Sequence, residues 1–191
     1  MNKLLEKIKK IPKGYFSLND LRKISPLKED SLKVALNRLA ASGELIKLGH
    51  QIYARDITKI NLEQLACAIY APSYLSCETA LAHYHILSQQ PLHLTLVTAK
   101  RSKVISIVNK NLIYHHFRPN LFWGNQIINN RIIAEPEKAF LDQAYLSLNG
   151  YARLDLEEMN LTFLNKVKLI KYCQKFKNKK LTKLVARLNF N

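Results

Sequence analysis

The chain has 191 residues, enough for one or two domains, and 48% of them are hydrophobic, which excludes a disordered protein. No apolar run approaches the ~20 residues that a membrane span needs, and the charged N-terminus lacks the apolar stretch of a signal peptide. Lysine and arginine number 30 against 14 aspartate and glutamate residues, and this net charge of +16 is typical of proteins that bind polyanions.

The basic excess is concentrated at the two ends of the chain. Residues 1–56 carry 12 basic and 6 acidic side chains, residues 57–160 carry 9 and 8, and residues 161–191 carry 9 and none. The alternative explanation of the positive charge is a lysine-rich genome that places lysine on every surface. That explanation predicts an even distribution of the basic excess along the chain. The cysteines Cys67, Cys77 and Cys173 form no C-x-x-C pair, which favours buried thiols in a cytoplasmic protein.

The first 56 residues predict three helices followed by a hairpin. Helices are expected over residues 3–11, 18–24 and 28–42, and a hairpin over residues 45–54. Ser17 is a good N-cap for the second helix, and Gly43 occupies the usual place of a left-handed residue after the third. This order of elements is that of a winged helix-turn-helix, in which the third helix enters the DNA major groove.

The third helix and the hairpin carry the candidate DNA-binding side chains. Leu32, Leu36 and Leu39 form an inward stripe on the helix, so its polar residues face outward. Arginine and lysine suit guanine and phosphate, and asparagine suits adenine. The candidate site residues are Lys28, Ser31, Lys33, Asn37, Arg38, Lys47, His50, Gln51 and Arg55. A solvated helix face, or a winged helix that binds protein, is the alternative.

The rest of the chain predicts a small mixed domain. Helices are expected over residues 62–70, 76–85 and 136–148, and strands over residues 92–97, 104–108, 112–117, 126–128 and 131–133. Asn129 and Asn130 suit the tight turn of a hairpin, and Pro136 suits the first turn of a helix. Ser76 is expected to cap the helix over residues 76–85. The sequence therefore predicts an α+β protein with a winged helix-turn-helix over residues 1–56 and a mixed α/β domain over residues 57–191.

The tail from Leu161 predicts one or two basic amphipathic helices. Docking of its apolar stripe on the domain is the favoured interpretation, and contact with nucleic acid, a partner or a membrane surface stays open.

No catalytic, metal or cofactor site is predicted. The pairs His83–His85 and His115–His116 lack the further ligands of a metal shell. The segment 135–138 (EPEK) fits the first turn of a helix better than a nuclease carboxylate–lysine cluster. Phosphate-binding glycine loops and the G-x-S-x-G motif are absent from the sequence.

Several segments resemble the AbiEi-like antitoxins, described as predicted transcriptional regulators of viral defence systems. The similar segments are residues 49–55 (GHQIYAR), 73–84 (SYLSCETALAHY), 94–101 (LTLVTAKR), 114–124 (YHHFRPNLFWG) and 134–142 (AEPEKAFLD). The last of these is the most specific, and the resemblance covers about residues 1–150.

The resemblance implies an antitoxin of a type IV toxin–antitoxin pair that acts in abortive infection. It implies that the N-terminal domain represses its own operon by binding inverted repeats as a monomer or weak dimer, cooperatively. The C-terminal domain would counteract a nucleotidyltransferase-like toxin, with direct binding left open. The alternatives are a stand-alone winged-helix regulator, a module that directly masks a toxin, and a nuclease or other enzyme.

Overall fold

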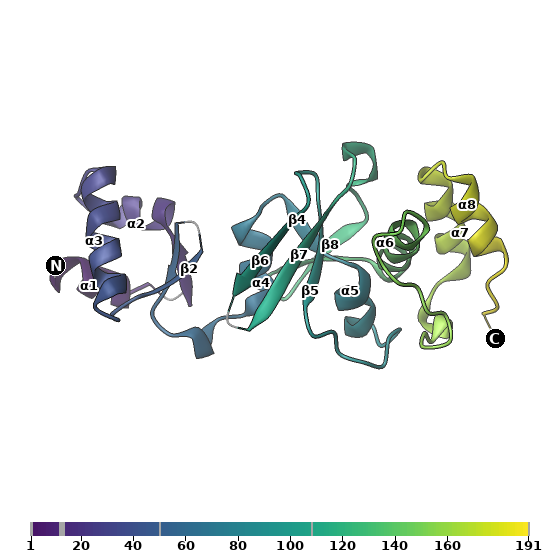
Figure 1. Ribbon diagram of the computed structural model, residues 1–191, viewed down its shortest axis with the longest axis horizontal. Helices are drawn as coiled ribbons and strands as arrows, with labels where there is room; N and C mark the ends of the chain where they lie inside the picture. Colours follow the sequence, from purple (N-terminus) through teal and green to yellow (C-terminus); the bar gives the residue numbers. More distant parts are fainter. Residues whose placement is uncertain (1, 12–13, 50, 108, 191) are drawn as a thin grey trace. The chain divides into compact units, whose positions relative to one another are not determined.

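The computed structural model describes residues 2–11, 14–49, 51–107 and 109–190, so the candidate residue His50 lies outside the described residues. The described residues form eight α-helices and two β-sheets (Figure 1), and the predicted α+β class is confirmed. No helix among them is long and apolar enough to cross a membrane.

The chain divides into two compact units, Met1–Leu65 and Ala66–Asn191. The division falls within helix α4 (Leu62–Ile69), so residues 57–65 group with the first unit. Each unit is described by itself below.

The first unit contains three helices and a three-stranded antiparallel sheet. Its elements are α1 (Asn2–Lys9), β1 (Tyr15–Ser17), α2 (Leu18–Ile24), α3 (Glu29–Ala41), β2 (Ile46–Gly49), β3 (Ile52–Ala54) and a 3-10 turn (Ile57–Lys59). The strand order is β1-β3-β2. The predicted helices and hairpin are present, and β1 is an additional strand that pairs with β3 along the register Phe16↔Tyr53.

Local sequence signals explain where these helices begin and end. The Ser17 side chain accepts a hydrogen bond from the Asp20 backbone N–H, and the Asp20 carboxylate accepts one from the Ser17 backbone N–H, which makes a capping box for α2. Gly43 has a φ of 77°, the left-handed conformation that ends α3. The buried residues of α1, β1, α2, α3 and β3 pack into one apolar core.

The second unit is built on a six-stranded mixed sheet with the order β6-β7-β5-β4-β9-β8. Its strands are β4 (Ser73–Leu75), β5 (Leu94–Thr98), β6 (Lys103–Ile107), β7 (Lys110–His116), β8 (Asn125–Ile128) and β9 (Arg131–Ala134). The central pair β4–β5 is antiparallel, the pairs β4–β9 and β5–β7 on either side of it are parallel, and the outer pairs are antiparallel. Asn129 and Asn130 both have positive φ, which confirms the tight turn between β8 and β9.

Four helices complete the second unit beside α4. They are α5 (Cys77–His83), α6 (Pro136–Leu148), α7 (Lys166–Lys175) and α8 (Lys179–Ala186), with 3-10 turns at Pro119–Leu121 and Leu161–Phe163. Pro136 begins α6 as predicted. The helices α7 and α8 pack on α6 (Figure 1), which supports docking of the basic tail on the domain.

The three cysteines are buried free thiols, as the sequence favours. One prediction about capping is wrong in its chemistry. Ser76 stands at the N-cap of α5, but its hydroxyl makes no cap hydrogen bond and instead donates to Asp142. The Ser76 hydroxyl therefore stabilises the buried Asp142 carboxylate, to which hydrogen bonds are strong, and not the first turn of α5.

Candidate nucleic-acid interface

Helix α3 presents one face to solvent because its other face is fixed in the core. Leu32, Leu36 and Leu39 are at most 1% exposed. With about 3.6 residues per turn, Val34 lies on the opposite side of the helix, and it is 50% exposed. Asn37 is exposed on the same face.

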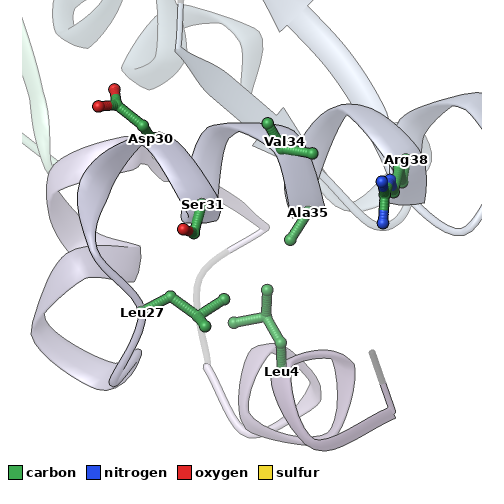
Figure 2. A pocket seen from close by; sticks show the side chains of 7 residues that line it. All are labelled: Leu4, Leu27, Asp30, Ser31, Val34, Ala35 and Arg38. Atoms are coloured by element: carbon green, nitrogen blue, oxygen red, sulfur yellow. The ribbon is translucent and has the colours of Figure 1, made fainter.

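An open pocket of about 490 Å³ lies between α3 and the start of the unit. Its lining residues are Leu4, Leu27, Asp30, Ser31, Val34, Ala35 and Arg38. Figure 2 shows Ser31 and Ala35 turned from α3 toward Leu4 and Leu27. The pocket thus has an apolar floor, with the exposed Asp30 and Arg38 as its two charged lining residues.

The hairpin adds a cation beside the exposed face of α3. Lys47 of β2 donates a hydrogen bond of 3.5 Å from Nζ to the Oδ1 atom of Asn37. The structure therefore brings together two predicted site residues that are ten positions apart in the chain. Both side chains remain exposed, as is Lys28 at the N-cap of α3.

Lys33 forms ion pairs with acidic residues of its own helix. Its Nζ atom lies 2.7 Å from Glu29 and 3.6 Å from Asp30, and Glu29 is also 2.9 Å from Arg22. The hydrogen bond and charge of Lys33 lower the pKa of Glu29, and the same hydrogen bond raises the pKa of Lys33. Lys33 thus neutralises an acid on the side of α3 that faces α2.

Arg55 and Gln51 have structural contacts. The Arg55 guanidinium donates to the backbone oxygens of Lys9 and Ile11 at 3.0 and 3.3 Å, where it satisfies the C-terminal end of α1. The Gln51 backbone oxygen accepts from Leu18, while its side chain is exposed in the β2–β3 turn. These contacts separate Arg55 from the group formed by Asn37 and Lys47.

Val34 was not among the predicted site residues. An apolar side chain can contact the methyl group of thymine. The exposure of Val34 could have been predicted from the sequence, because the stripe of Leu32, Leu36 and Leu39 places position 34 on the outward face of the helix.

The second unit holds a buried polar network that joins two of the segments singled out above. Lys138 and Asp142, one turn apart on α6, form an ion pair with no exposure to solvent. Lys138 also donates to the Tyr74 hydroxyl at 2.9 Å, and Asp142 accepts from Tyr74 and Ser76 at 3.1 and 2.8 Å. Burial raises the pKa of Asp142 and lowers that of Lys138, and their mutual attraction opposes both shifts.

Aromatic rings enclose the Lys138 ammonium group. Its Nζ atom lies 5.0–5.5 Å from the ring centroids of Tyr74, Phe117, Trp123 and Phe176. Gly124, with a φ of 71°, passes so close that an added Cβ would lie 3.0 Å from the Lys138 side chain. The four polar groups are fully buried and bonded to one another, so the network fastens β4 to α6.

No protein-family model matches the chain, and no curated protein is similar to it.

Proposed function

We propose that the first unit is a winged helix-turn-helix that binds duplex DNA in a sequence-specific manner, with α3 in the major groove. The observation that carries the proposal is the exposed face of α3, where Ser31, Val34, Asn37 and Arg38 stand beside Lys47 of the hairpin. The order of three helices and a β2–β3 hairpin supports it.

The chemistry of each side chain on this face indicates which part of the DNA it would contact. Asn37 and Arg38 have the donor and acceptor groups that match adenine and guanine edges, and Val34 suits a thymine methyl group. Lys28 and Lys47 are long exposed cations suited to phosphate. Lys33 and Arg55 are left out of the proposed contact set because of their intramolecular contacts.

The wider proposal is that this DNA-binding protein is a cytoplasmic antitoxin that represses its own operon and counteracts a nucleotidyltransferase-like toxin. The resemblance of residues 73–84 and 134–142 supports it. These two segments meet in the Tyr74–Ser76–Lys138–Asp142 network, so they contribute the framework of the second unit. Co-expression with a toxin encoded beside the gene, with growth as the readout, tests this part.

The test of DNA binding compares the region upstream of the gene with a scrambled duplex. The variant Asn37→Ala/Arg38→Ala should weaken binding to the upstream duplex by ~1–3 kcal/mol for each lost base contact, roughly tenfold or more in Kd. The preference over the scrambled duplex should fall with it, because these side chains read bases. Fluorescence anisotropy measures both constants.

The matched control removes the same side-chain types from exposed positions of the second unit. Arg101→Ala/Asn120→Ala should leave the preference for the upstream duplex unchanged. If the α3 variant keeps the full preference, α3 does not read the DNA sequence and the proposal is wrong.

A further inference from the structure

The helix α8 carries a row of cations on one side. Its buried residues are Leu181 and Val185, followed by Leu188 just beyond the helix. With about 3.6 residues per turn, the opposite side is formed by Lys179, Lys180, Lys183 and Arg187, and all four are exposed. We call these four side chains the α8 ridge.

The positive charge of the α8 ridge is uncompensated. Residues 161–191 contain no acidic side chain. None of the four cations forms an ion pair with a residue that the structure describes. Like charges on one helix face repel one another, so this arrangement costs stability unless an anion lies against it.

Two lysines of the neighbouring helix α7 have partners within the unit. Lys168 lies 3.3 Å from Glu135 and 3.1 Å from Glu137, and Lys175 lies 4.5 Å from the ring centroid of Trp123. These cations help to hold α7 on the rest of the unit. The contrast leaves the ridge as a set of cations with no role in packing.

We infer that the α8 ridge binds the phosphate backbone of duplex DNA without regard to sequence. Lys179, Lys183 and Arg187 are four residues apart, so they repeat about every 6 Å along the helix. Flexible cations without a pocket suit a repeating phosphate chain, which is recognised by charge and not by base edges. This second contact goes beyond the proposed role of α3 and does not depend on it.

A nucleic-acid partner fits the ridge better than an anionic membrane does. An amphipathic helix that binds a membrane inserts its apolar face into the headgroup region. In α8 that face is already buried in the unit, since Leu181 is 0% and Val185 is 6% exposed. Only the charged side is available to a partner.

The test measures how the affinity of the full chain for a scrambled DNA duplex depends on salt. The variant Lys179→Gln/Lys180→Gln/Lys183→Gln/Arg187→Gln removes the ridge charge and keeps helix-compatible side chains. Between about 50 and 200 mM KCl, the slope of log Kd against log salt should fall in magnitude by about 2–4, near 0.9 for each lost phosphate contact. Trp123 fluorescence verifies that the second unit is folded.

A matched control removes four exposed cations from other parts of the second unit. Lys100→Gln/Lys103→Gln/Lys110→Gln/Arg118→Gln causes the same change of net charge and should leave the slope nearly unchanged. Equal slopes for the ridge variant and this control would overturn the inference. So would equally good competition by poly-glutamate, or binding to phosphatidylserine vesicles that depends on the ridge while duplex binding does not.

The outcome is separable from that of the proposed function. In an Asn37→Ala/Arg38→Ala background, removal of the ridge charge should still flatten the salt dependence on scrambled DNA. If removal of the ridge charge flattens the salt dependence while the protein with an unaltered α3 shows no sequence preference, the ridge is supported and the α3 proposal is refuted.

Discussion

Lys138 depends on its surroundings for every interaction that water would otherwise supply. Its charge meets the Asp142 carboxylate, its Nζ atom bonds to Tyr74, and four aromatic rings lie around it. Removing one member of a buried ion pair leaves the other charge unpaired in a medium of low dielectric, which is far more costly than removing both.

Lys138→Met should therefore destabilise the second unit by about 3–5 kcal/mol. Trp123 is the single tryptophan of the chain and packs on Tyr172 and Phe176, so its fluorescence during urea unfolding reports this unit. The double variant Lys138→Met/Asp142→Leu should recover much of the loss. A single variant as stable as the wild type would refute the structural role of the pair.

For a single side chain, the sequence predicts interaction partners on the same helix better than partners from distant segments of the chain. Asp142 follows Lys138 by one turn of a predicted helix, so an ion pair between them is a local inference. Tyr74 belongs to β4, a strand of three residues with no alternating pattern, and Ser76 follows the strand at the N-cap of α5. Nothing local therefore indicates that they reach the same carboxylate.

The elements of the first unit depend on their terminal residues because they are short. Helix α2 has seven residues, and an isolated helix of that length is unstable in water. The capping box between Ser17 and Asp20 satisfies backbone N–H groups that would otherwise lack partners at its first turn.

Ser17→Ala should lower the stability of the first unit by about 1 kcal/mol, the usual cost of losing an N-cap. Amide hydrogen exchange of α2 and α3 measures the change. Asn19→Ala, at an exposed position of the same helix, serves as the control and should have a smaller effect. Equal effects of the two substitutions would mean that helix propensity, and not the cap, limits α2.

The sequence predicts elements well where a pattern runs over several turns or strand residues. The leucine stripe of α3, the asparagine turn between β8 and β9 and the proline at the start of α6 all lie where expected. The strands β1 and β4 were missed because each has three residues and is defined by its neighbours in the sheet.

The whole chain consists of two units with separate interiors. The core cluster of the first unit contains buried residues from Leu4 to Tyr53 only. The sequence indicated two parts through its charge distribution and motifs, but it placed the boundary at residue 56, whereas the contacts group residues 57–65 with the first unit. A short connecting helix such as α4 carries no local signal of which core it joins.

Two separate cores predict two unfolding transitions. Ser17→Ala should shift the transition seen by circular dichroism for the first unit and leave the Trp123 fluorescence midpoint in place, and Lys138→Met should do the reverse. Urea titration followed by both probes tests this expectation. A single transition moved equally by either substitution would show that the units unfold together.

The buried network has a further consequence for how this sequence can vary over generations. Replacing Lys138 or Asp142 alone leaves the opposite charge buried and unpaired, whereas exchanging the whole set of four for apolar residues leaves no polar group without a partner. Any gradual path between those two states passes through poorly folding ancestors. Descendants of this gene should therefore inherit the four positions as a group, although they come from distant parts of the chain.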